Sequence, residues 1–511
     1  MMNQRFKRAR AIRLIVLATT MVACSDLLDV QREGLVTDET LGTAAAANAM
    51  RVGVLTGINS LTGGVTGGVS NTVSQGALWG LSGLFADEWR AANNSAAPIG
   101  NTDRRNPLTS PAGYSTIHDV RFRISLAIPQ LRQFMPSQPI YIGQMYFVLG
   151  IVETYLAEYF CNGTPLSRVV NGVVEYGPPL SNRQVLDSAI AHFDSALSYL
   201  PASSAPATEL RRAAQIMRAR AYLGRDNAAP LDAATGIANA QAPVAPAVAA
   251  AIAAADSIYG NTPNYVYAHT YAANQLSNEN WSVNFPNAGG NFMVEDTVAP
   301  NYPVPGSRRG AAVGFASAND PRVPVAGTTL APGTSPTAAQ GGPTAFDGTR
   351  AVRQLVFGQF TRNNIVSALD ARLMSAEVDL RGGSYAAMTA KLNALRATTY
   401  PVSQLVTYNA NALPALAVPT TANDAAKQFF REKAFWTFGR GQRMPDLRRM
   451  LRQYGTPYGF ANDDAVFPSG ISNLNAAAFE HAVNFAIADA ERTNPNVSAG
   501  ADGTMCVDRK P

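Results

Sequence analysis

Few residues that could do chemistry stand in a recognised catalytic spacing. The chain has four histidines, His118, His192, His269 and His481, and no two of them have a close metal-ligand spacing such as His-Glu-x-x-His. Ser82 is followed directly by glycine, so residues 80–83 are not the Gly-x-Ser-x-Gly nucleophile elbow. Residues 439–441 lack the third glycine and the preceding strand of a dinucleotide-binding loop. The sequence therefore predicts no zinc hydrolase, serine hydrolase or dinucleotide enzyme.

The adjacent carboxylates Asp87 and Glu88 are candidates for acid/base chemistry on a glycosidic bond. That reaction needs two carboxyl groups roughly 5 to 10 Å apart across the sugar. Neighbouring residues of a helix point in different directions, so this pair does not meet the requirement. We predict that the protein is not an enzyme, and a surface-anchored glycoside hydrolase is kept as an alternative.

A second concentration of charge lies near the carboxy terminus and contains Arg431, Glu432, Arg440, Arg443, Asp446 and Arg448. Arginine–carboxylate pairs also fix a helix end to the turn that follows it. We predict this structural role for the cluster. No cofactor is predicted, and bound calcium would leave no signature, because its oxygen ligands would come from scattered loops.

Two segments combine the groups that a sugar-binding site needs, which are aromatic faces and amide or guanidinium donors. The first starts at a tryptophan and the second is rich in tyrosine. The candidate ligand-binding residues are Trp89, Asn93, Asn94, Arg104, Tyr265 and Trp281. For the second segment the alternative is a strand with buried bulky residues, because 265–267 alternates Tyr-Val-Tyr.

The amino terminus has the pattern of an export signal. Five basic residues precede the apolar run 14–22, which is about half the length of a membrane-spanning helix. Ala23 and Cys24 then resemble a lipobox, with Met21 where leucine is usual, and Cys24 would carry the lipid, palmitate among its acyl chains. The alternative is an ordinary secretory signal. Lipidation would anchor the protein to a membrane without spanning it.

The charge of the chain argues against a nucleic-acid partner. The signal carries five basic and no acidic residues, so removing it from a chain of formal charge +5 leaves a mature protein near neutrality. Beyond the leader we expect no segment to span a membrane. Export would permit a disulfide between Cys161 and Cys506, but the two thiols could equally be unpaired.

Hydrophobic periodicity predicts a mostly helical fold. The clearest helix covers 141–160, where apolar residues recur at three- and four-residue intervals, and Asn182 is expected to cap the next. Paired helices in series would form a tetratricopeptide-like scaffold. Helices are expected at 40–51, 77–89, 141–160, 182–200, 208–223, 365–379, 384–396, 425–453 and 476–492, with irregular structure at 57–76 and 296–348.

Several segments together resemble the SusD/RagB-like outer-membrane nutrient-binding lipoproteins. The resemblance is carried by Cys24-Ser-Asp-Leu-Leu-Asp-Val30, the helix 141–160 followed by Gly163-Thr-Pro-Leu166, Asn319-Asp-Pro-Arg322, Ala376-Glu377 and the segment 430–449. That last segment is similar to the family's carboxy-terminal signature, in which an Arg-Glu helix leads to a Gly-x-Arg turn and Asp-Leu-Arg-Arg. The turn, 439–443, matches only loosely.

The resemblance implies one SusD-like domain at 24–511 behind a cleaved signal at 1–23. Within it, 141–225 and 365–396 would be helical scaffold, 296–348 an irregular loop region and 425–453 the signature. It also implies a cell-surface, lipid-anchored protein that passes a glycan, or a peptide, to a TonB-dependent SusC-like outer-membrane transporter. Beside this binding lipoprotein and the surface-anchored glycoside hydrolase, a third hypothesis is a tetratricopeptide-like protein-interaction scaffold.

Overall fold

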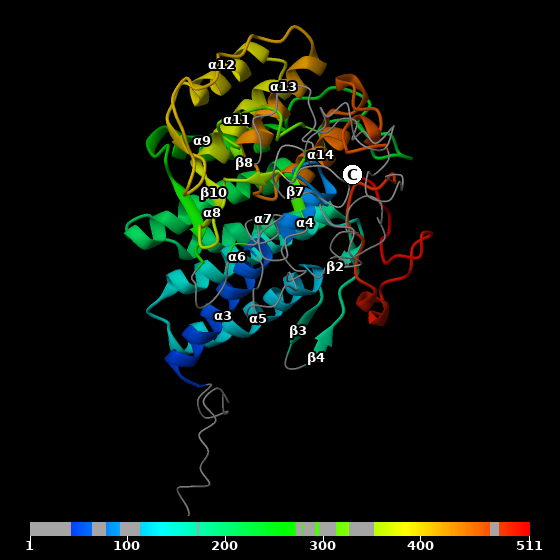
Figure 1. Ribbon diagram of the computed structural model, residues 1–511. Coiled ribbons are helices and arrows are strands. Elements are labelled where there is room, and N and C mark those ends of the chain that lie inside the picture. Colours follow the sequence, from blue (N-terminus) through cyan, green and yellow to red (C-terminus); the bar gives the residue numbers. More distant parts are fainter. Residues whose placement is uncertain are drawn as a thin grey trace, which may run out of the picture.

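The computed structural model describes residues 42–63, 78–91, 113–170, 173–271, 278, 292–295, 313–326, 352–470 and 480–511 (Figure 1). The fold is mostly helical, as predicted. Its α-helices are α3 (Ala44–Gly63), α4 (Leu78–Phe85), α5 (Gly113–Phe134), α6 (Pro139–Tyr159), α7 (Asn182–Tyr199), α8 (Ala205–Arg225), α9 (Pro246–Asn261), α11 (Ala368–Arg381), α12 (Tyr385–Arg396), α13 (Ala422–Trp436) and α14 (Arg443–Arg449).

The strands are short and form two-stranded antiparallel ladders. The pairs are β1 (Trp89–Ala91) with β7 (Phe292–Val294), β2 (Thr164–Pro165) with β5 (Pro179–Leu180), β3 (Arg168–Val170) with β4 (Val173–Glu175), β6 (Val266–His269) with β10 (Asn363–Ser367), β8 (Val325–Ala326) with β9 (Arg353–Gln354), and β11 (Tyr400–Pro401) with β12 (Thr407–Tyr408). They tie loops to the helical body.

Helices that follow one another in the chain pack against one another. The contacts run from α3 to α5, then through α6, α7, α8, α9, α11 and α12. In Figure 1 the series rises from α3 and α5 at the bottom to α12 at the top. This is the serial stacking of helices expected for a tetratricopeptide-like scaffold.

Helix α6 is the central core element. Within the described part of the chain it is the one helix long and apolar enough to cross a membrane, with 72% of its most apolar window buried in the protein. Gly150 lets α7 approach closely, because a Cβ there would lie 2.6 Å from the ring of Phe193. Composition alone does not exclude a membrane span here, and the burial of α6 identifies it as a core helix.

The cap of α7 differs from the prediction by one residue. Ser181, not Asn182, is the N-cap: its hydroxyl accepts from Gln184 N at 3.3 Å, and Gln184 Oε1 accepts from Ser181 N at 2.9 Å. This capping box satisfies two backbone donors at once. Asn182 instead donates its side-chain amide to the carbonyl of Phe160 and so ties α7 to the end of α6.

Other boundaries also differ. Helix α3 continues to Gly63 through a stretch expected to be irregular. Gly57 within it lets α5 pack closely, because a Cβ there would lie 2.7 Å from Val120 of α5. Helix α5 had not been predicted. The expected helix 476–492 is wrong over its described part, 480–492, where only the 3-10 turn η6 (Asp489–Thr493) forms. There the Phe485 backbone pairs with Tyr159 and Cys161 and is not available to a helix.

Candidate functional site

A cavity of about 570 Å³ opens between α5, α6, α7, the β3–β4 hairpin and η6. This volume lies within the range of small-molecule sites. The polar and aromatic residues that line it include His118, Arg121, Phe122, Glu153, Tyr176 and His192. In Figure 1 the hairpin and α5 lie together at the lower side of the molecule.

The floor of the cavity is built on a buried carboxylate. Glu153 is 1% exposed, and its oxygens lie 2.8 Å from His192 Nδ1 and 3.3 Å from Arg121 Nε. Burial alone would raise the pKa of Glu153, but the hydrogen bond and charge of His192 and the charge of Arg121 outweigh it and hold that pKa below its usual value. The floor is therefore an ordered, ionised network.

The rim of the cavity is apolar and aromatic. Phe122 and Tyr176 are 44% and 45% exposed, and Val174 of β4 stands beside them in the lining. Glu491 of η6 also lines the cavity, where its carboxyl accepts a hydrogen bond from Tyr114 Oη at 3.0 Å, and burial raises the pKa of Glu491. The cavity therefore combines exposed aromatic side chains with buried charged groups.

The two described residues that were predicted to bind ligand, Trp89 and Tyr265, do not line this cavity. Trp89 is 0% exposed and meets Phe438 edge-on at 4.7 Å between ring centres, and Tyr265 is buried with its hydroxyl donated to the carbonyl of Glu209. Both side chains are core elements here. Four other candidates and the lipidation cysteine lie outside the described residues: Asn93, Asn94, Arg104, Trp281 and Cys24.

The cavity residues were missed because they come from separate elements. His118 and Arg121 lie on α5, Glu153 on α6 and His192 on α7. The sequence did contain one signal: a glutamate inside the most apolar helix predicts a buried partner of opposite charge. Arg121 of α5 is that partner, and His192 Nδ1 lies 2.8 Å from the other oxygen of the same carboxylate.

The carboxy-terminal charges have the structural role that was predicted for them. Arg443 donates to both oxygens of Asp87, at 2.6 and 2.8 Å, and Arg440 donates to Asp370 at 2.6 and 3.1 Å. Asp446 accepts from Lys433 and Arg449 at 2.7 Å. A second cavity among these groups measures about 20 Å³, room for about one water molecule and not for a nutrient.

The adjacent carboxyl groups of Asp87 and Glu88, which follow α4, are also buried in the core. Asp87 is 0% exposed and also accepts from Val313 N, while Glu88 is 1% exposed and accepts from Gly439 N at 2.8 Å. Burial raises the pKa of Glu88 to about 8, so its carboxyl is mainly neutral at pH 7. Neither group lines the cavity of about 570 Å³ or that of about 20 Å³, both of which are formed by described residues.

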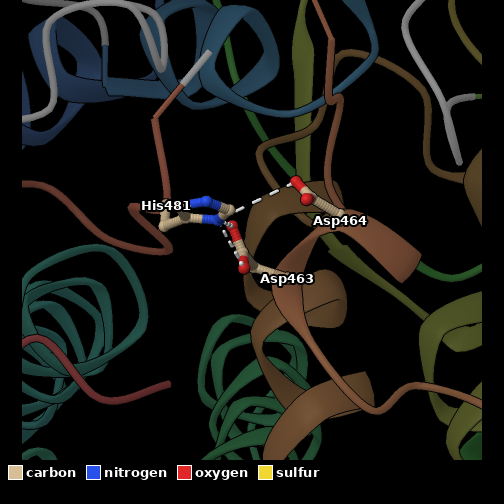
Figure 2. A group of neighbouring side chains, drawn as sticks. All are labelled: Asp463, Asp464 and His481. Atoms are coloured by element: carbon tan, nitrogen blue, oxygen red, sulfur yellow. Dashed lines mark hydrogen bonds and ion pairs between the residues drawn. The ribbon is translucent and has the colours of Figure 1, made fainter.

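Figure 2 shows a third group of side chains, in which His481 Nδ1 is directed at Asp463 and Asp464. It lies 3.1 Å from one oxygen of Asp463 and 3.9 Å from Asp464 Oδ1. An imidazole with two carboxylates is a ligand set for a divalent transition metal more than for calcium. The imidazole is 76% exposed, and its contacts with the two carboxyl groups hold the cluster together without a metal.

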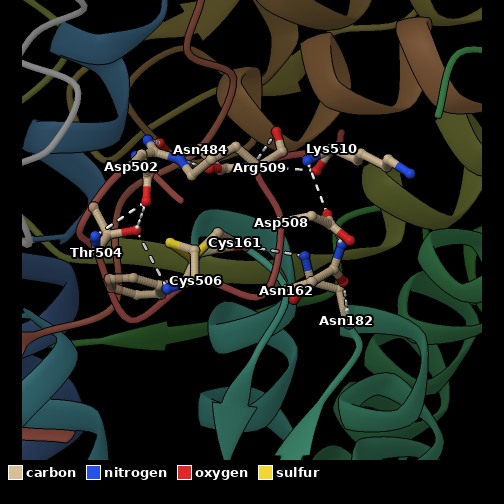
Figure 3. The surroundings of a disulfide bond; sticks show 11 residues. Cys161, Asn162, Asn182, Asn484, Asp502, Thr504, Cys506, Asp508, Arg509 and Lys510 are labelled. Carbon is tan, nitrogen blue, oxygen red and sulfur yellow. Dashed lines mark hydrogen bonds and ion pairs between the residues drawn. A yellow bond between two sulfur atoms is a disulfide. The ribbon is translucent and has the colours of Figure 1, made fainter. Parts of the chain in front are cut away.

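Cys161 and Cys506 form a disulfide, which decides between the two states that the sequence left open. Figure 3 shows it at the junction of α6 with the carboxy-terminal segment. Around it Asn162 Nδ2 donates to Asp508 Oδ1 at 2.7 Å, and Val507 N donates to Asn162 O at 2.8 Å. The bond therefore holds residues 480–511, including η6 with its wall of the cavity, against the helical body.

Comparisons with known proteins show which solved structures have a similar fold. No protein-family model matches the chain, and no curated protein matches it in sequence. Among solved structures, a SusD superfamily protein from Bacteroides fragilis is similar over 89% of this chain and 98% of its own, with a TM-score of 0.56 and 14% identity. NanU of B. fragilis is similar over 91% of this chain and 98% of its own, with a TM-score of 0.54 and 11% identity.

A third solved structure, a SusD-like carbohydrate binding protein from Bacteroides vulgatus, covers 89% of this chain and 97% of its own. Its TM-score is 0.54 at 12% identity. The matches extend over nearly the whole of both partners. The chain thus has the fold of the SusD superfamily, as its resemblance in sequence implied.

Proposed function

We propose that this chain, which has the SusD fold, is a nutrient-binding lipoprotein that captures an oligosaccharide at the cell surface and passes it to a TonB-dependent SusC-like transporter. The observation that carries the proposal is the match to SusD superfamily structures over about nine-tenths of the chain. The same sequence carries, in residues 1–23, the pattern of an export signal directly before Cys24.

The anchoring part of the proposal rests on the leader. A lipid on Cys24 would hold the domain at the outer membrane through acyl chains, each buried methylene contributing about 0.8 kcal/mol. Nineteen residues lie between Cys24 and the start of α3 at Ala44. A chain of that length spans at most about 70 Å.

A carbohydrate ligand is favoured by two observations. One neighbour of similar fold is a SusD-like carbohydrate binding protein. The cavity beside α5 combines exposed ring faces with imidazole, guanidinium and carboxylate groups, the mixture that recognises hydroxyl-rich ligands. A peptide is the second ligand class that the same surface would accept.

Binding without turnover tests the proposal against the glycoside hydrolase alternative. The mature protein is incubated with neutral oligosaccharides, and the free and retained fractions are separated and analysed by mass spectrometry. We expect an intact oligosaccharide to be retained. The release of shorter products by the protein, and not by heat-denatured protein, would favour the hydrolase.

A further inference from the structure

An exposed apolar surface lies on α5 and the β3–β4 hairpin. On α5, Phe122 and Leu126 stand one turn apart and are 44% and 45% exposed. On the hairpin, four further apolar side chains are between 37% and 66% exposed: Val170, Val173, Val174 and Tyr176. We call these six residues the hairpin surface. Its two parts are joined at the 570 Å³ cavity, which Phe122, Val174 and Tyr176 line together.

The free edges of the hairpin make this exposure unusual. In the described chain β3 and β4 pair with each other alone, so each strand has one edge without a neighbouring strand. Val170 and Val173 are opposite each other at the turn, and Val173, at 66%, is the most exposed large apolar side chain in the described chain. Proteins usually place charged residues or proline at such an edge. Apolar groups gathered there are typical of a surface that another molecule covers.

The hairpin surface lies near the point at which the chain enters the domain from its leader. In Figure 1 the start of α3 and the β3–β4 hairpin are both at the lower end of the molecule. Gly57 of α3 closely approaches Val120 of α5, two residues before Phe122, and follows Ala44 by thirteen residues. Thirteen residues of helix span about 20 Å. A lipid on Cys24 would therefore hold the domain by the end that carries this surface.

The charges beside the surface favour a protein partner over a lipid bilayer. On the hairpin Arg168 pairs with Glu175 at 2.6 Å, and on α5 Arg123 pairs with Asp119 at 2.8 Å. Each of these two exposed cations thus has a carboxylate of its own. An anionic lipid surface is recognised by clusters of unpaired lysine and arginine. Apolar and aromatic groups with a rim of mixed charge are typical of a protein interface.

We infer that the hairpin surface is the part of this chain that docks on the TonB-dependent transporter. The inference rests on the proposed function and adds to it the face that meets the barrel. The barrel would lie in the same membrane as the lipid, and the hairpin surface is at the tethered end of the domain. Burial of its apolar side chains would drive the association. The cavity would then lie beside the contact, because three residues belong to both.

The test compares how much barrel copurifies with tagged full-length variants from detergent-solubilised outer membranes of the source cells. Val173→Glu and Leu126→Glu place a charge on the two parts of the hairpin surface, and neither residue lines the cavity. A carboxylate buried in an apolar contact is costly. Relative to wild type, we expect each variant to bring down at least about 10-fold less barrel per tagged chain, which corresponds to about 1.4 kcal/mol.

Val418→Glu is the matched control. Val418 is 53% exposed and precedes α13, which lies at the upper end of the molecule in Figure 1. This variant should bring down as much barrel as the wild type. All three variants should melt within a few degrees of wild type, because each changes an exposed side chain. If Val173→Glu unfolds the hairpin, Leu126→Glu on α5 still decides the result.

Equal amounts of barrel with the wild type and both surface variants would refute the docking surface while the proposed function stands. A wild type that brings down no barrel would instead refute the proposed function, and the docking surface with it. Two other results would assign the surface to a different occupant, if Val173→Glu and Leu126→Glu abolish them. They are copurification of two differently tagged copies of this chain, and sedimentation of the unlipidated mature protein with phosphatidylglycerol vesicles.

Discussion

Arg443 of α14 donates two hydrogen bonds, of 2.6 and 2.8 Å, to the carboxylate of Asp87. Asp87 follows α4 and lies 356 positions earlier in the chain. Both side chains are buried, at 4% and 0% exposure. The pair joins the carboxy-terminal signature to the amino-terminal half of the fold. An arginine and a carboxylate so close together would form a candidate enzyme site only if they faced a cavity.

Breaking this pair should destabilise the protein strongly. Arg443→Met leaves the Asp87 carboxylate buried without its cation, and we expect a loss of about 3–5 kcal/mol in the free energy of unfolding. Urea denaturation followed by circular dichroism measures it. Arg123→Met, which removes a pair exposed on both sides, is the control and should cost less than about 1 kcal/mol. Equal effects of the two substitutions would contradict the structural role.

The Cys161–Cys506 disulfide should contribute to stability and hold the cavity wall. It closes a loop of 345 residues. Replacing both cysteines by serine is expected to lower the free energy of unfolding by about 2–5 kcal/mol. The melting temperature is measured with and without reductant. Reductant should lower it for the wild type and leave the double variant unchanged, and a wild type that is insensitive after complete reduction would refute the prediction.

Glu88 should make the protein less stable as the pH rises. Its pKa is raised from 4.5 to about 8 on folding, so between these values the native state holds a proton that the unfolded state has lost. The contribution of Glu88 to the free energy of unfolding is therefore full below pH 4.5. It falls toward pH 8, by at most about 1.36 kcal/mol per pH unit. Glu88→Gln, neutral at every pH, should remove this slope. Urea midpoints from pH 5 to 8 for both proteins decide it, and parallel curves would contradict it.

His269 should act in the opposite direction on the acid side. Burial lowers its pKa from 6.5 to about 3, so between these values the unfolded state binds a proton that the native state does not. Its contribution is full above pH 6.5 and is lost as the pH falls toward 3. His269→Gln should flatten the stability profile between pH 6.5 and 4. His481→Gln, at an exposed site, should leave the profile as in wild type.

Regular elements with a one-sided apolar stripe could be predicted from the sequence. Helices α6, α7 and α8 lie within a few residues of their predicted bounds, because their periodicity and the residues at their ends agree. Helix α5 carries a similar stripe through Ile117, Val120, Ile124 and Leu131, but Pro129 within it argues against a continuous helix.

The rest depends on contacts between distant residues. The segment 480–492 has a helix-compatible composition, yet its backbone bonds to the end of α6 and its chain is fixed by a disulfide from Cys506. The cavity is formed by side chains from α5, α6, α7 and η6, between 118 and 493. Local periodicity carries no information about which of these faces meet, so the site could not be read from the sequence.

The most direct test of the proposed function is affinity purification of the tagged full-length chain from detergent-solubilised outer membranes of its source cells. Mass spectrometry then identifies its partners and the amino-terminal peptide, with a Cys24→Ala variant as the control. The account predicts a TonB-dependent barrel in near-equal amount and a diacylglycerol on Cys24 that the variant lacks. An unlipidated wild-type protein that brings down no barrel would contradict it.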